Sequence, residues 1–166
     1  GYNYLYRLNC GGDDYTDSFG QLWLQDNTNY SRSWAENFKD LNPYLASQRT
    51  TNDPIHGTRD WTLFQHFRFG RHQLEYRFPV ADGTYRIELY FTEPWHGTGG
   101  SASADCEGLR IFDVAVNDSV VLDDLDIWAE SGHDGVCKKV VYAIVKGGML
   151  KIHFPEVKAG QALISG

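Results

Sequence analysis

The stretch Asp82-Gly83-Thr84-Tyr85-Arg86-Ile87-Glu88-Leu89-Tyr90-Phe91 has a regular alternation that decides the class of fold. From Tyr85 to Phe91, large apolar side chains at every second position alternate with Arg86, Glu88 and Tyr90, which is the period-two pattern of a half-buried β-strand. The Asp-Gly pair in front of it is typical of a hairpin turn. We therefore expect a strand here, joined by a hairpin to the apolar run 74–80.

Similar short apolar runs follow one another along the chain. Turn signals at 117–118 and 146–148 predict two further hairpins. The strands expected are 4–8, one beginning near Leu63, 74–80, 85–91, 111–116, 120–122, 140–145, 150–154 and 161–164. No convincing amphipathic helix or internal repeat is visible, and residues 13–60 are irregular and polar with isolated large side chains. This spacing of strands predicts an all-β protein, an antiparallel β-sandwich.

Length, charge and cysteine content exclude several classes of protein. The 166 residues suit a single domain, 1–166, that can bury a core. The net charge of −7 argues against nucleic acid as a partner, and no apolar run is long enough to span a membrane. Three cysteines without a C-x-x-C pair predict neither a disulfide framework nor structural zinc. If one bridge forms, Cys106–Cys137 is the expected pair.

Two aromatic segments point to the function. Glu93-Pro94-Trp95-His96-Gly97-Thr98-Gly99-Gly100 continues the strand 85–91 into a glycine-rich loop, and Phe64-Gln65-His66-Phe67-Arg68-Phe69-Gly70 holds three aromatic rings. Rings held where strands become loops form a flat apolar face on which a sugar ring can stack. We expect Trp95 and Phe69 to stack, and His96, Glu93, Arg68 and Trp61 to complete the site.

Each of these residues also has a structural alternative. Trp95 and Phe69 could belong to the core, and Phe67 should share the face of Phe69 if the strand is extended. Glu93 could orient the loop, and Arg68 could pair with Glu93 or reach an acidic sugar. Nearer the N-terminus, Tyr15, Asp17 and Trp23 are expected to be structural. We expect Asp17 to hydrogen-bond to the backbone of its loop.

Catalysis and metal binding find little support. A glycosidase needs two facing carboxylates, for which Glu93 with Asp105 or Glu107 is the available set, and we prefer a loop role for Glu93. The histidines show no catalytic metal spacing. The carboxylates of Asp123-Asp124-Leu125-Asp126 suit calcium chemically, but their spacing is not that of a helical calcium loop, and a solvated acidic loop is the alternative. We expect no enzyme activity and no cofactor.

Several segments, in chain order, resemble the malectin-like family. They are Leu8-Asn9-Cys10-Gly11-Gly12; Asp17 to Trp23; Leu63 to Gly70, similar to L-[YF]-Q-x-x-R-[YF]; Phe112 to Asn117, similar to F-D-V-x-[VL]-N-G with Asp118 for the glycine; and Val121 to Ile127, similar to V-x-x-D-L-D-I. Segments 14–23, 53–58, 93–100 and 160–162 are similar to carbohydrate-binding module family 57, in the subgroup appended to bacterial family 2 glycoside hydrolases.

This resemblance implies a jelly-roll-like β-sandwich that serves a hydrolase in cis, outside the cytoplasm in the periplasm or secreted. By position, the sugar-binding residues of malectin fall on Phe69, Trp95 and His96, where histidine replaces an aromatic hydrocarbon ring. Its upstream tyrosine falls near Tyr44. Its aspartate falls near 155–160, where this chain is shorter and Glu156 is a weak substitute.

Together these observations predict a non-catalytic module that binds an oligosaccharide or polysaccharide and belongs to a larger glycoside hydrolase. The alternative is a structural module that packs against a catalytic domain or mediates dimer contacts, with the aromatic residues in that interface.

Overall fold

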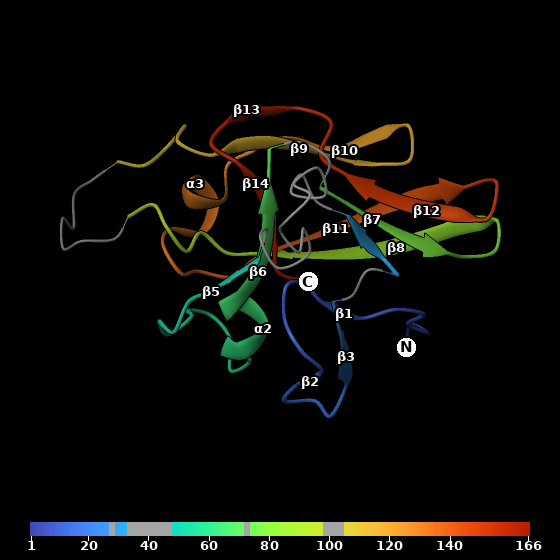
Figure 1. Cartoon of the computed structure of the whole chain (residues 1–166), viewed down its shortest axis with the longest axis horizontal. Helices are drawn as coiled ribbons and strands as arrows, with labels where there is room; N and C mark the ends of the chain where they lie inside the picture. Colours follow the sequence, from blue (N-terminus) through green and yellow to red (C-terminus); the bar gives the residue numbers. More distant parts are fainter. Residues whose placement is uncertain (27–28, 33–47, 72–73, 98–104) are drawn as a thin grey trace, which may run out of the picture.

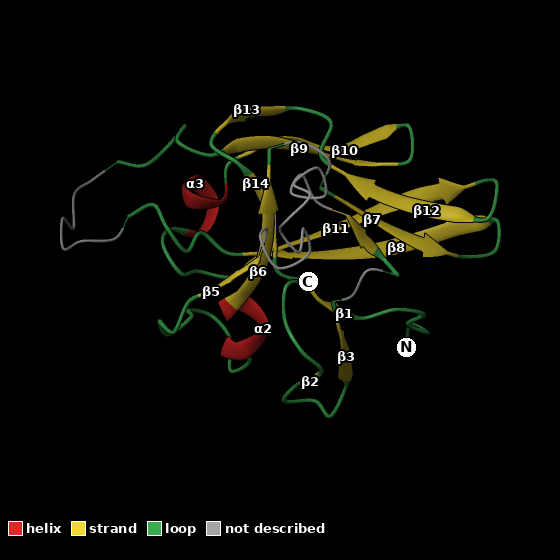
Figure 2. Ribbon diagram, viewed as in Figure 1, coloured by secondary structure: helices red, strands yellow, loops and turns green. Residues whose placement is uncertain are grey.

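The computed structural model describes residues 1–26, 29–32, 48–71, 74–97 and 105–166 (Figure 1). Strands dominate these residues, and two one-turn helices accompany them (Figure 2). The elements are β1 (Leu8–Asn9), β2 (Tyr15–Thr16), β3 (Leu22–Gln25), β4 (Ser31–Arg32), β5 (Gln48–Thr50), α2 (Trp61–Gln65), β6 (His66–Gly70), β7 (Glu75–Pro79), β8 (Gly83–Phe91), β9 (Ile111–Val116), β10 (Ser119–Leu125), α3 (Ile127–Ser131), β11 (Cys137–Val145), β12 (Met149–His153), β13 (Val157–Ala159) and β14 (Ala162–Ile164). The all-β prediction is confirmed.

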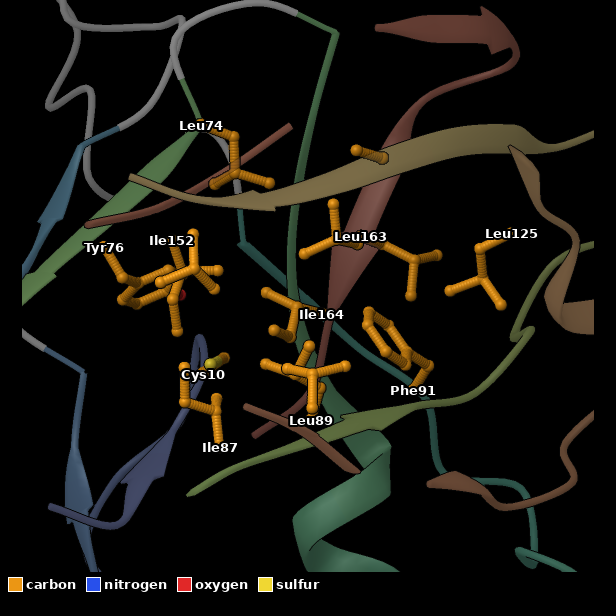
Figure 3. Packing of buried hydrophobic residues seen from close by; sticks show 14 of the residues in the cluster. Cys10, Leu74, Tyr76, Ile87, Leu89, Phe91, Leu125, Ile152, Leu163 and Ile164 are labelled. Carbon is orange, nitrogen blue, oxygen red and sulfur yellow. The ribbon is translucent and has the colours of Figure 1, made fainter. Parts of the chain in front are cut away.

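Two sheets make the sandwich. One has the order β10-β9-β12-β7-β4, with β13 also paired to β9, and the other is the long antiparallel pair β8–β11. Figure 3 shows the side chains of both sheets meeting between them, with Ile87, Leu89 and Phe91 on the β8 side. Phe112, Val114 and Val116 of β9 join the same buried cluster. This packing of two antiparallel sheets confirms the expected β-sandwich.

Two of the three predicted hairpins are wrong. The turn at 117–118 does join paired strands, since Ser119 of β10 lies opposite Val116 of β9. However, β7 pairs with β12 and β8 pairs with β11, so the turns at 82–83 and 146–148 carry the chain from one sheet to the other. Hydrogen bonds from Gly148 N to Asp82 Oδ1 (2.8 Å) and from Val80 N to Gly148 O (3.1 Å) hold these two crossings side by side. Consecutive strands that alternate between sheets in this way are typical of a jelly roll.

Two smaller sheets complete the described fold. The order of one is β14-β6-β5, and β6 and β14 run steeply across the direction of β8 and β9 (Figure 1). The other has β3 between β1, which is parallel to it, and β2. The chain end beside β14 bonds to β8, because Ser165 N donates to Tyr90 O at 2.8 Å. Because β6 pairs with β14, this end of the chain also ties β6, which bears Phe69, to β8.

A buried ion pair fastens the N-terminal strands to the rest. Arg68 Nε lies 2.7 Å from Asp26 Oδ2, and both side chains are 1% exposed. The hydroxyl of Tyr76 and the backbone N–H of Gly11 also donate to Asp26 Oδ2, each at 2.8 Å. Gly11 has φ +71°, and a Cβ there would lie 2.5 Å from Phe67 O, which explains the glycine. One carboxylate thus joins β1, β6 and β7.

Other local expectations need correction. Residues 4–7 form no strand, and β1 covers Leu8–Asn9. Leu63 does not begin a strand, because 61–65 form helix α2, which buries Leu63 and Phe64 against Trp23 and Ile55. Cys106 and Cys137 are buried thiols, so they form no bridge. No helix in the described part of the chain is long and apolar enough to cross a membrane.

Candidate functional site

The loop that follows β8 is organised by Glu93, whose side chain is 0% exposed. Glu93 Oε1 lies 2.6 Å from Arg110 Nε, and Glu93 Oε2 accepts hydrogen bonds from the backbone N–H groups of Trp95 (3.1 Å) and His96 (3.4 Å). Both carboxylate oxygens are therefore used within the protein. The loop turns around a buried charge, and this fixes the backbone from which Trp95 and His96 project.

Helix α3 and the segment after it support the same loop from another direction. The Nδ1 atom of His133 lies 3.0 Å from His96 O, and this contact is a hydrogen bond when Nδ1 carries the proton. Gly97 has φ +91°, and a Cβ on it would lie 2.8 Å from Trp128 Nε1. Only glycine fits both conditions without displacing its neighbours. The loop is thus held against Trp128 and His133.

Trp95 leaves this fixed backbone toward solvent. It is 74% exposed, so the core alternative for Trp95 is wrong. His96 beside it is half-buried, as is Trp128 of α3 under Gly97. Trp128 was not among the predicted site residues. The signal that could have found it is the tryptophan directly after the D-L-D-I motif.

A second aromatic surface lies on β6, where Phe69 is partly exposed and also packs against the main hydrophobic core, as its structural alternative expected. The Phe69 ring centroid lies 6.3 Å from that of Phe67, which confirms that the two rings share a face of the strand. The exposed Arg49 of β5 places its guanidinium 5.4 Å from the centroid of the Phe69 ring. Arg49 was likewise missed, because only the pairing of β5 with β6 brings it here.

The Glu93–Arg110 pair connects the two aromatic regions. Arg110 Nη1 donates to Gln161 O at 2.7 Å, and the next residue, Ala162, lies opposite Gly70 at the end of β6. The same guanidinium therefore contacts the Trp95 loop and the β14–β6 edge. This arrangement gives both surfaces one rigid support.

Two predicted polar contacts with sugar need correction. Arg68 pairs with Asp26 rather than with Glu93, and Glu93 pairs with Arg110. A buried ion is costly unless it is paired and hydrogen-bonded, and both groups find such partners inside the protein. Neither Arg68 nor Glu93 presents its charge to a ligand on the surface, so we retain neither as a sugar contact.

Three of the remaining candidates, Trp61, Glu156 and Asp105, are exposed. Trp61 is 45% exposed at the start of α2, where its Nε1 donates to Thr58 O at 3.1 Å, and α2 precedes β6 whereas Phe69 is near the end of that strand. Glu156 is exposed before β13. Tyr44 and residues 98–100 lie outside the described residues. Asp105 is exposed, and its Oδ1 accepts from Glu107 N at 2.9 Å.

The residues predicted to be structural behave as such. Asp17 accepts hydrogen bonds from the backbone N–H groups of Phe19 and Gln21, each at 2.9 Å, and from Trp23 Nε1 at 3.0 Å. Trp23 is buried and packs edge-on against Tyr90. The Tyr15 hydroxyl donates to Asp60 Oδ1 at 2.9 Å. These residues stabilise the first loops of the chain.

The three acidic residues proposed for calcium are separated. Asp123 and Asp124 lie near Asp113, and the ammonium of Lys158 pairs with Asp124. Asp126 instead caps α3, since its Oδ1 accepts from Ala129 N at 3.1 Å and its Oδ2 accepts from Gly108 N at 2.7 Å. Lysine already supplies positive charge to this acidic group.

The fold and the loop together define a β-sandwich that presents aromatic rings on rigid backbone. The Malectin domain model matches residues 4–166, and the chain belongs to the malectin domain family. Domains of this family are a non-catalytic, carbohydrate-binding type. The expected family is therefore confirmed.

Individual relatives agree with this assignment. The chain is 25% identical to Danio rerio malectin over 150 residues, which cover 90% of this chain and 47% of that protein, and 26% identical to Mus musculus malectin over 149 residues, which cover 89% and 45%. It spans about half the length of the curated relatives it matches.

Solved structures share the fold. A Bacteroides uniformis beta-glucuronidase aligns with a TM-score of 0.74 at 22% identity, over 96% of this chain and 17% of that one. The ANX2 ectodomain from Arabidopsis thaliana aligns with a TM-score of 0.73 at 17% identity, over 98% and 48%. The same sandwich thus occurs both within a glycoside hydrolase and within a receptor ectodomain.

Proposed function

We propose that this chain is a non-catalytic module that binds an oligosaccharide or polysaccharide by stacking it on Trp95. The observation that carries the proposal is an indole that is 74% exposed on a loop fixed by a buried ion pair. A large apolar ring held in solvent on a fixed backbone can gain free energy by stacking on a ligand, because stacking removes apolar surface from water. His96 supplies a polar group beside the ring.

The second surface, formed by Phe69 with Arg49 above it, would extend the contact along the ligand. Arg49 takes the part first assigned to Arg68, because its guanidinium is exposed and can donate to hydroxyl or carboxylate groups. Stacking contributes about 1 kcal/mol beyond area burial, by analogy with aromatic pairs. Each hydroxyl hydrogen bond adds little net free energy, because it replaces a bond to water. Binding by the isolated module should therefore be weak.

We further propose that the module serves a glycoside hydrolase in cis, outside the cytoplasm. Its likeness to a domain of a bacterial beta-glucuronidase, and to a plant receptor ectodomain, supports this proposal. Attachment would compensate for weak binding, because a tethered catalytic domain experiences a high effective concentration of polysaccharide. The module itself would not cleave the polysaccharide, since Glu93 is buried and both of its carboxylate oxygens are bonded by Arg110 and the backbone.

Affinity gel electrophoresis on β-glucan, α-glucan, xylan and polygalacturonate tests the proposal. At least one polymer should retard the wild-type module and be recovered with its length unchanged. Trp95→Ala should lower retention about fivefold or more, since 1 kcal/mol is about a fivefold change in Kd, at an unchanged melting temperature. Phe19→Ala is the matched control, because Phe19 is also exposed but lies in the turn between β2 and β3.

A second candidate is an interdomain or dimerisation module without sugar binding. The side chains of Val140, Tyr142 and Ile144 lie exposed at alternate positions of β11 and form an apolar stripe. If Trp95→Ala changes neither retention nor stability, the stacking site is wrong, and this stripe becomes the better-supported functional surface.

A further inference from the structure

A compact cluster of ionisable groups lies beneath the Trp95 loop. Asp53, His133 and Asp134 each offer one ligand atom, and these atoms all lie within 4.8 Å of one another. Backbone bonds hold the cluster in place: Asp134 N donates to Glu93 O at 3.0 Å, and His56 N donates to Asp134 O at 2.8 Å. The cluster therefore joins the 53–56 segment to the base of the loop.

One oxygen of the Asp134 carboxylate lacks a partner, although the other oxygen faces His133. Asp134 is 4% exposed, and its Oδ1 is buried without a hydrogen-bond partner. Burial raises the pKa of the Asp134 carboxyl; His133 lowers it, and the facing Asp53 carboxyl raises it. By contrast, the Asp26 carboxylate is equally buried but is bonded by Arg68 and Tyr76. An unpartnered carboxylate atom is costly, and a second carboxylate beside it increases that cost.

His133 adds an independent constraint. When its Nδ1 donates to His96 O, its Nε2 presents a lone pair toward Asp134 Oδ2, which is 2.9 Å away. Two acceptors at this distance need a proton or a cation between them. A histidine whose Nδ1–H bonds a backbone carbonyl, which leaves the Nε2 lone pair for a ligand, has the arrangement common among metal-ligating histidines.

We propose that Asp53, His133 and Asp134 form a binding site for one divalent transition-metal ion of the zinc type. Two carboxylate oxygens and one imidazole nitrogen form a mixed donor set that suits Zn²⁺, whereas Ca²⁺ prefers six to eight oxygen ligands. The ion would join Asp53, His133 and Asp134. It would thereby support the Trp95 loop through the contacts of His133 and Asp134 with His96 and Glu93. None of the three proposed metal ligands is among the residues proposed to contact sugar.

Calorimetric titration of the metal-free protein with Zn²⁺ tests the proposal. We expect one saturable site and a melting temperature that rises with Zn²⁺, because an ion that binds the folded state stabilises it. Co²⁺ in place of Zn²⁺ should give the visible absorption bands of a mixed nitrogen and oxygen site. Asp53→Asn and Asp134→Asn should weaken Zn²⁺ binding by at least the 10–100-fold typical of lost outer-shell partners.

Two choices keep the test clear. Asp53 is exposed, and Asp134 has φ +53°, a conformation that asparagine also accepts, so both variants should fold. Asp123→Asn, in the other acidic cluster, is the control and should bind as wild type. The proposal is overturned by no saturable Zn²⁺ binding, by saturation with Ca²⁺ alone, by binding that survives both Asp53→Asn and Asp134→Asn, or by binding lost in Asp123→Asn.

Discussion

Gly97 shows how one residue can set the position of the proposed sugar-binding loop. Its φ of +91° belongs to the region that favours glycine, and the space where a Cβ would lie is taken by Trp128 Nε1 at 2.8 Å and His133 Cβ at 3.0 Å. Gly20 has a similar φ of +78°, but a Cβ on it would meet open space. Comparing alanine variants at Gly97 and Gly20 therefore separates the effect of backbone strain from the effect of a steric clash.

Gly97→Ala should therefore be more harmful than Gly20→Ala. Both substitutions place alanine at positive φ and should lower the free energy of unfolding by about 1–3 kcal/mol. Gly97→Ala should also displace the loop and reduce polysaccharide retention, whereas Gly20→Ala should retain sugar as wild type does. Urea unfolding and affinity gels on both variants measure these effects. Equal retention by the two variants would show that contact with Trp128 does not position the loop.

The sequence predicted the exposed aromatic residue but not the roles of the charges near it. Trp95 could be found because strand alternation ends there and a glycine follows within two residues. Glu93 and Arg68 were expected to contact sugar, with an ion pair between them as one alternative. Their true partners, Arg110 and Asp26, are 17 and 42 residues away and become visible only when the strands are placed. The Asp53, His133 and Asp134 cluster was hidden for the same reason.

At the scale of the elements, a buried charge ties strand β6 to its neighbours. Arg68 on β6 shares the Asp26 carboxylate with Tyr76 of β7 and Gly11 beyond β1. Arg68→Met keeps most of the side-chain volume but leaves Asp26 without its counterion. Loss of one partner from a buried ion pair typically costs about 3–5 kcal/mol of the free energy of unfolding, so this variant should unfold at much lower urea.

Arg77→Met provides the comparison. Arg77 Nε lies 2.9 Å from Glu75 Oε1, but the Arg77 side chain is 43% exposed. Exposed pairs contribute about 0–1 kcal/mol, and the unfolding midpoint should barely move. Similar losses in the two variants would mean that burial does not make the Arg68–Asp26 pair special.

The connections between elements were harder to predict than the elements themselves. Strands β7, β8, β9 and β14 follow directly from apolar patterns, because each buries alternate or consecutive side chains. The Asp82-Gly83 turn looks like a hairpin turn because its local backbone preference is the same whether the next strand pairs with the last one or crosses to the other sheet. That choice is made by distant pairing, as when residues 83–91 align with 137–145.

At the scale of the whole molecule, buried thiols and phenols should limit stability in alkali. Burial raises the pKa of the Cys137 thiol to about 12, and burial followed by the hydrogen bond to Asp60 raises the pKa of the Tyr15 hydroxyl to about 12. Burial also raises the pKa of Cys10 far above its ordinary range. In the unfolded chain these groups would ionise near 8.5 for cysteine and near 10 for tyrosine.

The sign of the effect follows from proton counts. Between about pH 8.5 and pH 12 the unfolded chain has released the Cys137 proton while the folded chain retains it, so the free energy of unfolding falls as pH rises, by about 1.4 kcal/mol per pH unit for each such group. Urea unfolding from pH 8 to 11 under reducing conditions should show this fall. Cys137→Ala should make this pH dependence shallower by about 1.4 kcal/mol per pH unit, which corresponds to one proton. The small cavity that the substitution leaves should lower stability equally at every pH and so should not affect the slope. An identical slope in Cys137→Ala would show that the thiol ionises alike in both states, and hence that it is not sealed inside the sandwich.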